Sequence, residues 1–282
     1  MSVAIVQGCS SGLGLALTQH ILRHTNLTVY ALTHQSTSSE FRDRIAVNVG
    51  KGKERLTVLS GVDVREERGL EKAAETVKER EGKGSVRLVA CLAGVLHAEK
   101  SLGAIDLETA LSTFQINTLG HLLTYKHFVP LIPNKREFKS LQSSWQDPEK
   151  PKDPARGMIG RDNSLCFSLS ARVGSISDNE RGGWYSYRAS KAALNQVVRC
   201  LDHELANKSS SAIAVGYHPG TVLTSFTSPI IGKDAKPDLE HGRLTVDQAI
   251  DSMTKVMGKV TREGDEKWGG RCWDWKGERI EW

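Results

Sequence analysis

The stretch SVAIVQGCSSGLGLALTQHILR, residues 2–23, decides the fold class of this chain. Ser2 to Gln7 is a short apolar run and predicts a buried strand, while Leu13 to Arg23 repeats its apolar residues near helical spacing and predicts a helix. Between them lies the glycine pattern Gly8-x-x-x-Gly12-x-Gly14. Free backbone N–H groups at a helix start, together with the helix dipole, bind anions. The stretch therefore predicts a phosphate-binding turn, and a purely structural tight turn is the alternative.

The remainder of the chain alternates between strand-like and helix-like segments. Strands are predicted at residues 27–33, 55–60, 86–92, 165–169, 212–217 and 271–274. Helices are predicted at residues 69–81, 107–129, 184–205 and 246–257. This alternation predicts a single doubly wound α/β domain of the Rossmann type over residues 1–282, with a mostly parallel sheet and helices on both faces. Ligands bind such sheets at the carboxyl ends of the strands.

Residues 133–163 interrupt this alternation. They contain four of the eight prolines, many charged residues and little periodicity. Long loops of this kind are either functional or mobile. We predict a mobile surface insertion, and the alternative is a segment that borders a substrate cleft.

Composition and charge narrow the class of protein. With 39% hydrophobic and 25% charged residues the chain is typical of a soluble enzyme. It has no apolar run of about eighteen residues and no apparent secretory signal, so we expect no membrane partner. The net charge of +5 is interspersed along the chain, which argues against nucleic acid as a partner. The five scattered cysteines favour reduced thiols and a cytoplasmic location, and the histidine spacing predicts no metal site.

A second motif, Tyr187-x-x-x-Lys191, lies in the segment WYSYRASKAAL at residues 184–194. Residues four apart share one face of a helix. A lysine ammonium beside a phenol favours the phenolate and is expected to lower the tyrosine pKa. That would bring Tyr187 closer to the pH range in which a proton-transfer group is most useful. The alternative is a core aromatic followed by a solvated surface lysine.

Taken in chain order, the motifs resemble those of the short-chain dehydrogenase/reductase family over nearly the whole length. They are Gly8-Cys-Ser-Ser-Gly12-Leu-Gly14, Val62-Asp63-Val64, Leu92-Ala93-Gly94-Val95, Ile116-Asn117-Thr118-Leu-Gly120, Ser168-Leu-Ser170, Tyr187-x-x-x-Lys191 and His218-Pro219-Gly220-Thr221. The segment Ser170-Ala-Arg-Val-Gly-Ser-Ile and the terminal Trp-Asp-Trp-Lys-Gly-Glu look like the small carbonyl reductases related to the bacterial C-factor protein.

The resemblance implies catalytic roles for four residues. Tyr187 would donate a proton to a substrate carbonyl oxygen, or remove one in oxidation, and Lys191 would bind the nicotinamide ribose. Ser170 would hydrogen-bond the substrate oxygen, and Asn117 would support a water that relays protons. Ser170 lies seventeen residues before Tyr187, farther than the family usually has it, so Ser168 and Ser175 stay as rival serines.

The resemblance also implies a nucleotide cofactor. The residues expected to contact it are Gly8, Ser10, Ser11, Gly12, Leu13, Gly14, Thr33, His34, Asp63, Val64, Ala93, Gly94, Asn117, Tyr187, Lys191, Pro219, Gly220, Thr221, Val222 and Thr224. NADP is favoured over NAD, because the region from Thr33 to Ser38 offers no acid for a ribose 2′-hydroxyl. The basic residue expected for a 2′-phosphate is missing there, unless His34 or Arg42 serves.

The sequence thus predicts an enzyme that reduces a ketone or aldehyde with NADPH, as a homodimer or homotetramer joined through the helices at 107–129 and 184–205. Residues 221–245 are expected to form the substrate loop, with Trp184 and Phe226 as candidate substrate-facing aromatics. An NAD-dependent alcohol dehydrogenase and a catalytically silent nucleotide-binding redox sensor are the alternatives.

Two departures from the family pattern precede the expected cofactor contacts. Gln7 stands where the family usually has threonine, and Cys91-Leu92 replace an asparagine pair. The first of these asparagines ties neighbouring strands in the family, so we expect a packing substitute for it.

Overall fold

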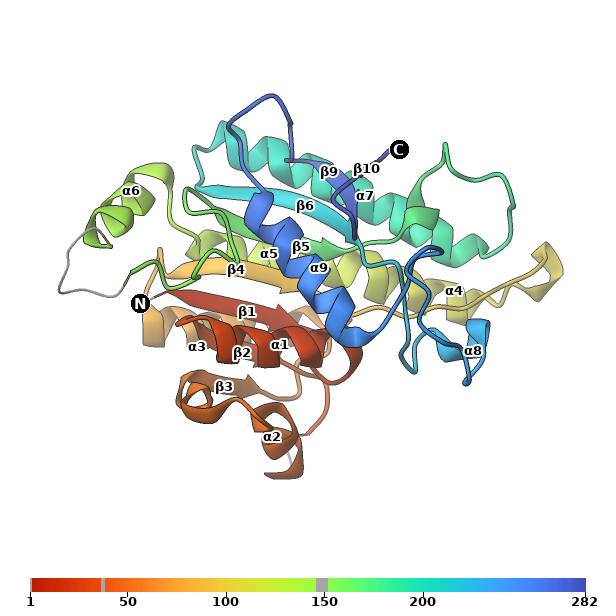
Figure 1. Ribbon diagram of the computed structural model, residues 1–282, viewed down its shortest axis with the longest axis horizontal. Helices are drawn as coiled ribbons and strands as arrows, with labels where there is room; N and C mark the ends of the chain where they lie inside the picture. Colours follow the sequence, from red (N-terminus) through yellow and green to blue (C-terminus); the bar gives the residue numbers. More distant parts are fainter. Residues whose placement is uncertain (1, 37–38, 146–151) are drawn as a thin grey trace.

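The computed structural model describes residues 2–36, 39–145 and 152–282. It has three layers, with a central sheet between two groups of helices (Figure 1). Strands of the main sheet run in the order β10-β9-β6-β5-β4-β1-β2-β3. Neighbouring strands are parallel throughout, except that β10 is antiparallel to β9. The predicted doubly wound α/β fold is confirmed.

The strands of this sheet are short and nearly all apolar, because helices cover both faces. Their bounds are β1 Val3–Gln7, β2 Thr28–Leu32, β3 Leu56–Leu59, β4 Val86–Cys91, β5 Ser164–Leu169, β6 Ala212–His218, β9 Arg271–Asp274 and β10 Arg279–Ile280. A separate two-stranded sheet joins β7 Thr221–Val222 to β8 Arg243–Leu244. After β1 the chain extends the sheet through β2 and β3, and then returns to the other side of β1 with β4. A crevice for ligands forms at such a reversal point.

Helices α1 (Gly12–His24), α2 (Ser39–Ala46) and α9 (Val246–Lys259) pack on one face of the sheet, where Leu17, Ile45 and Met253 belong to one apolar cluster. Helices α3 (Glu67–Glu81), α5 (Gly120–Phe128) and α7 (Tyr185–Asn207) cover the other face and contribute to a second cluster. The predicted helix at 107–129 is not one regular α-helix. It consists of α4 (Leu107–Phe114), a π-helical turn Gln115–Leu119, α5 and a 3-10 turn Val129–Leu131. Helix α8 (Ser228–Ile231) is a single turn.

The segment predicted as a mobile surface insertion, residues 133–163, contains regular structure in its described part. Helix α6 (Lys135–Ser144) begins with a capping box, in which Asn134 and Glu137 each accept a backbone N–H of the other. Beyond residue 151, Ala155, Met158 and Ile159 are buried in the first apolar cluster. The part of this segment beyond residue 151 has no periodic sequence pattern because its buried residues are separated by turns.

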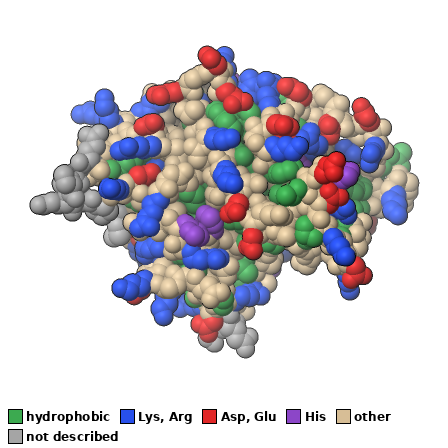
Figure 2. All heavy atoms as spheres, in the orientation of Figure 1, with side chains coloured by type: hydrophobic (Ala, Val, Ile, Leu, Met, Phe, Trp, Pro, Cys, Tyr) green, Lys and Arg blue, Asp and Glu red, His purple; other side chains and the backbone are tan. Residues whose placement is uncertain are grey.

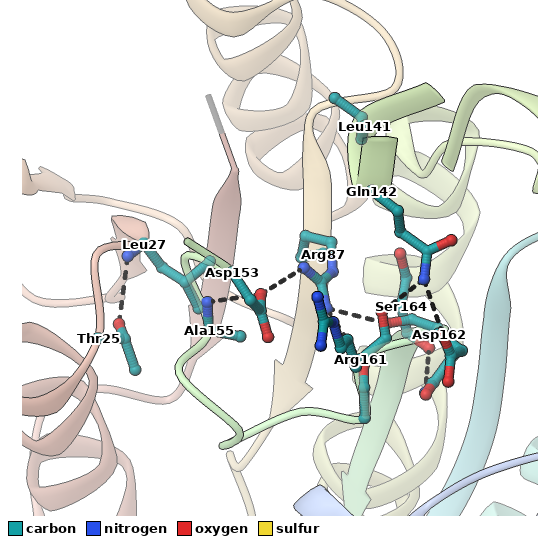
Figure 3. A network of polar contacts seen from close by, with 12 residues as sticks. Thr25, Leu27, Arg87, Leu141, Gln142, Asp153, Ala155, Arg161, Asp162 and Ser164 are labelled. Carbon is teal, nitrogen blue, oxygen red and sulfur yellow. Dashed lines mark hydrogen bonds and ion pairs between the residues drawn. The ribbon is translucent and has the colours of Figure 1, made fainter. Parts of the chain in front are cut away.

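An arginine anchors this segment to the sheet (Figure 3). Arg87 on β4 is fully buried, forms an ion pair with Asp153 at 3.1 Å and donates to the carbonyl groups of Gly160 and Asn163. Its guanidinium also lies 4.8 Å from the ring centroid of Phe138, which is on α6, and 4.9 Å from that of Trp145, which directly follows α6. The network lies at the amino end of β4, opposite to the end at which ligands bind.

Charged side chains of both signs are mixed over the face drawn in Figure 2, as far as that face is described. Within the described parts of the chain, no helix is long and apolar enough to cross a membrane.

Candidate active site

A cavity of about 670 Å³ opens at the carboxyl ends of β1, β2, β4, β5 and β6. It is lined by every residue that the sequence predicted to contact a cofactor except Asn117, which lies behind it. Segments far apart in the chain therefore meet here, from the glycine turn at residue 8 to the loop after β6. The cavity lies where the strand order reverses, between β1 and β4.

The glycine turn has the geometry of a phosphate site. Gly8 has a φ of 81° and Gly12 a φ of 52°, values that side chains disfavour. A Cβ on Gly14 would lie 2.0 Å from the carbonyl oxygen of Gly8, so only glycine lets α1 start this close to β1. The N-cap Ser11 makes no side-chain hydrogen bond to α1 within the described structure, and the first turn carries no acid. The free N–H groups of this helix start fit an anionic phosphate.

The end of β2 is tied to this turn through hydroxyl groups. Ser10 and Thr33 share a hydrogen bond of 2.7 Å, and Arg44 on α2 donates to the backbone carbonyl of Ser10 at 2.8 Å. Arg44 is thus a basic residue that touches the backbone of this corner, although neither Arg44 nor Arg42 lines the cavity. Sequence reasoning missed Arg44 because its approach depends on how α2 packs.

A basic residue that does line the cavity lies beside Asp63. Arg65 forms an ion pair of 2.6 Å with Asp63, and this hydrogen-bonded guanidinium lowers the pKa of the carboxyl group. Its signal in the sequence is only its position two residues after Asp63, just outside the Val62-Asp63-Val64 motif. Together with His34, the pair forms the polar wall of the cavity at this end.

Helix α7 brings the predicted Tyr187 and Lys191 into the cavity on one face. Both are buried, at 6% and 2% exposure. The Lys191 ammonium donates to the Leu169 carbonyl at 2.7 Å and lies 5.9 Å from the Tyr187 ring centroid. Burial lowers the pKa of Lys191 to about 7. Burial also raises the pKa of Tyr187, so the expected lowering by Lys191 is wrong for this arrangement.

The start of α7 is held by the loop after β4. Trp184 has a left-handed backbone (φ 51°), and its N–H donates to the Glu99 carbonyl at 2.6 Å. The Glu99 side chain accepts a hydrogen bond from the Ser186 hydroxyl. The Trp184 ring meets the Tyr187 ring edge-on at 6.2 Å between centroids. These contacts fix the angle at which Tyr187 enters the cavity.

Of the three candidate serines, Ser170 alone lines the cavity. Ser168 is fully buried and hydrogen-bonds His121 and Tyr125, at 3.2 Å and 2.8 Å. Ser175 accepts the backbone N–H of Asp178. The long spacing to Tyr187 is taken up by a 3-10 turn (Arg172–Gly174) and the loop that follows it. The geometry favours Ser170.

Asn117 occupies the π-helical turn between α4 and α5. Its side chain accepts the N–H of Val95 at 2.8 Å and donates to the Val95 carbonyl and the Ser190 hydroxyl, both at 3.0 Å. A Cβ on Gly94 would lie 3.3 Å from the Asn117 side-chain oxygen and 3.7 Å from the Lys191 nitrogen. Asn117 and Lys191 therefore approach the same point beneath Gly94.

Gln7, one of the departures from the family pattern, and His121 both hydrogen-bond the backbone of Ala93. The Gln7 side-chain oxygen accepts the Ala93 N–H at 2.9 Å, and His121 Nε2 donates to the Ala93 carbonyl at 2.9 Å. Burial lowers the pKa of His121 to about 3, so the ring is neutral and its Nδ1 accepts from Ser168. Cys91 is buried in the second apolar cluster. Gln7 and His121 thus hold the cavity-lining loop at Ala93. His121 was not foreseen from the sequence.

The opposite end of the cavity is more apolar. Trp184 and Phe226, the two candidate aromatics, both line it, as do Ile230 and Ile231 on α8. The expected substrate loop, residues 221–245, contains β7, α8 and β8. Its part from Thr221 to Ile231 contributes to the cavity lining. His218 also lines it, and burial lowers the pKa of this ring to about 4. Across the described residues, no cluster of three or more His, Cys, Asp or Glu side chains could hold a metal ion.

The fold and this cavity define a doubly wound α/β protein with a nucleotide-type site at its switch point. Residues 2–137 match the family model described as short chain dehydrogenase. The 1-hydroxy-2-glutathionyl-2-methyl-3-butene dehydrogenase of Rhodococcus sp. strain AD45 is 30% identical over 210 residues, 74% of each chain. The C-signal protein of Myxococcus xanthus is 29% identical over 71% of this chain and 94% of its own.

Solved structures agree on the fold. The NADPH-bound carbonyl reductase from chicken fatty liver superposes with a TM-score of 0.75 at 24% identity, over 100% of both chains. The chain belongs to the short-chain dehydrogenase family, as its motifs predicted, and is therefore an oxidoreductase.

Proposed function

We propose that this protein reduces a ketone or aldehyde with NADPH, and that Tyr187 donates the proton. The observation that carries the proposal is the convergence of Ser170, Tyr187 and Lys191 with the glycine turn in one cavity. The similarity of fold to an NADPH-bound carbonyl reductase supports it.

Some residues of the cavity would bind the cofactor, and others would transfer the proton. A bound nicotinamide supplies the hydride, whereas the protein supplies orientation and electrostatics. The glycine turn and the start of α1 would hold the phosphates, and Asp63 with Val64 would face the adenine. Pro219, Gly220 and Thr221 would hold the nicotinamide end.

The protonation state of Tyr187 is compatible with reduction. Burial raises the pKa of this phenol, so at neutral pH it holds the proton that reduction of a carbonyl requires. The pKa of Lys191, lowered to about 7, makes it a group that can exchange protons near neutral pH. Asn117, close to Lys191 beneath Gly94, would support the water that resupplies the proton.

The preference for NADPH over NADH rests on the corner between the glycine turn and the end of β2. Arg44 reaches the Ser10 carbonyl there, and no acid is available from Thr33 to Ser38. We infer that the Arg44 guanidinium, which lies beside this corner but outside the cavity lining, turns toward a bound 2′-phosphate and holds it by charge and by hydrogen bonds. His34 and Thr33 line the same corner.

We also infer a homodimer or homotetramer. The helical segment formed by α4 and α5 carries a concentration of exposed large apolar side chains. The exposed fractions are 68% for Leu107, 50% for Leu111, 46% for Leu119 and 43% for Leu122. Replacing Leu111 and Leu122 with glutamate should lower the mass measured by light scattering to that of one chain. An unchanged mass would argue against this interface.

The five free cysteines favour a reducing, cytoplasmic compartment.

The test is titration with NADPH and NADH by nicotinamide fluorescence, followed by a panel of carbonyl compounds and the Tyr187→Phe variant. Tight NADPH binding with turnover, and a loss of at least about a thousandfold in kcat for Tyr187→Phe with unchanged binding, supports the proposal. Preference for NADH with alcohol oxidation would favour the dehydrogenase alternative. Binding without turnover of any compound would favour the redox sensor.

A further inference from the structure

Behind Ser170, outside the cavity lining, lies a buried amide on the face of α7 that also carries Tyr187 and Lys191. Asn195 is one helical turn beyond Lys191 and is 3% exposed. The Ser170 hydroxyl donates to its side-chain oxygen at 2.6 Å, and both groups are buried. The backbone of Ser170 is fixed independently, because its N–H donates to the Tyr217 carbonyl at 2.8 Å.

The orientation of the amide follows from its second partner. Asn195 Nδ2 donates to the Gly174 carbonyl at 3.4 Å, and a carbonyl can only accept. The amide oxygen must then face Ser170, so Ser170 is the donor in the 2.6 Å bond. The buried thiol of Cys272 also faces Ser170, but sulfur is a weaker acceptor than an amide oxygen.

A serine hydroxyl has one proton to donate. With that proton on Asn195, the oxygen lone pairs of Ser170 are left for the cavity that it lines. A lone pair accepts a hydrogen bond from an alcohol O–H but repels a carbonyl oxygen. The arrangement therefore discriminates between the two partners of a carbonyl–alcohol reaction.

We propose that Asn195 is a positioning residue that holds the Ser170 proton and so makes Ser170 a hydrogen-bond acceptor toward the cavity, favouring bound alcohol over bound carbonyl. The inference rests on the proposed function and refines the role of Ser170 within it. A carbonyl substrate would receive its hydrogen bond from Tyr187, and from Ser170 only after the bond to Asn195 is released.

The main test compares KM for one carbonyl from the panel with KM for its alcohol. In Asn195→Ala the freed hydroxyl can donate, so the ratio of alcohol KM to carbonyl KM should rise about tenfold, the effect of one hydrogen bond. The rise should vanish when Ser170→Ala is already present, because Asn195 acts through Ser170. An unchanged ratio, or the same rise in the Ser170→Ala background, would overturn the proposal.

Two further variants separate this role from a structural one. Asn195→Asp keeps an acceptor oxygen for Ser170 but loses the donor to Gly174. Its ratio of alcohol KM to carbonyl KM should therefore stay at the wild-type value or fall. A rise like that of Asn195→Ala would contradict the proposal. Gln196→Ala removes the neighbouring exposed amide and should leave the ratio unchanged; a rise there would overturn the assignment to Asn195.

A readout without substrate keeps the inference distinct from the proposed function. If the wild type reduces no carbonyl, the proposed function fails, but urea unfolding still tests the bond. Asn195→Ala and Ser170→Ala should then be non-additive by about tenfold in the unfolding equilibrium constant, whereas Gln196→Ala and Ser170→Ala should be additive. Additivity of the first pair would overturn the inference, whatever the enzyme does.

Discussion

Replacing Lys191 with methionine should stabilise the folded protein at neutral and acidic pH while removing its activity. Lys191 is 2% exposed, and burial lowers its pKa from 10.5 to about 7. Methionine has a similar length and needs no solvation. The position is therefore one where the chemistry proposed above opposes the stability of the fold.

The magnitude follows from the pKa. At about 1.4 kcal/mol for each pKa unit, a lowering from 10.5 to about 7 corresponds to a destabilisation on the order of 5 kcal/mol by the buried ammonium. The lost hydrogen bond to the Leu169 carbonyl offsets about 1 kcal/mol of the gain, and imperfect packing of methionine offsets more. We expect Lys191→Met to be more stable than the wild type by about 2 kcal/mol at pH 6.

The sign of the pH dependence is fixed by linkage. Between pH 7 and pH 10.5 the unfolded lysine binds a proton that the folded one lacks, so wild-type stability rises with pH in this window. The destabilisation is complete below pH 7 and is lost as the pH approaches 10.5. The advantage of Lys191→Met should therefore be largest at pH 6 and shrink steadily toward pH 9.

The assay is urea unfolding at pH 6, 7.5 and 9, followed by tryptophan fluorescence. Lys208→Met is the matched control, because Lys208 directly follows α7 and its side chain is 73% exposed. The difference in free energy of unfolding between Lys208→Met and the wild type should not change with pH in this window. A wild type that is more stable than Lys191→Met at pH 6, or a difference that does not shrink with rising pH, would refute the reasoning.

Three other substitutions test separate parts of the structure. Arg44→Ala should raise the Kd for NADPH about tenfold and leave NADH binding unchanged in fluorescence titrations, because a lost phosphate contact is worth about 1.4 kcal/mol; equal losses for both nucleotides would argue against Arg44. Arg87→Leu should lower the free energy of unfolding in urea by about 3 kcal/mol, because Asp153 loses a buried partner, with turnover of the folded enzyme unchanged; wild-type stability would show that the network contributes little. Gly14→Ala should abolish nucleotide binding, measured by the same fluorescence, since its Cβ would lie 2.0 Å from the Gly8 carbonyl oxygen; an unaltered Kd would contradict the geometry of the turn.

The sequence was sufficient where the signal is local. A glycine turn between a strand and a helix, and a tyrosine and lysine one helical turn apart, are short patterns whose geometry follows from neighbouring residues. Gly8, Tyr187 and Lys191 line the cavity as their motifs indicated. Alternation of strands and helices was likewise enough for the fold class.

What the sequence did not indicate depends on contacts between distant segments. Arg44 reaches Ser10 across 34 positions, His121 reaches Ala93 across 28, and Asn195 reaches Ser170 across 25. None of these has a spacing that singles it out. The pKa of Tyr187 was misjudged for a related reason, since the pairing with Lys191 can be read from the sequence but the depth of burial cannot.

The arginine in the strand core has a consequence for how related chains vary. Position 87 on β4 and the segment that supplies Asp153 belong to one buried unit, so the two should be gained and lost together. In some relatives the connection between α5 and β5 should be short and lack the anchored segment. Such a relative should carry an apolar residue at position 87, as the neighbouring positions of β4 do. An arginine at this position would then mark, from the sequence alone, which members of the family carry the anchored segment.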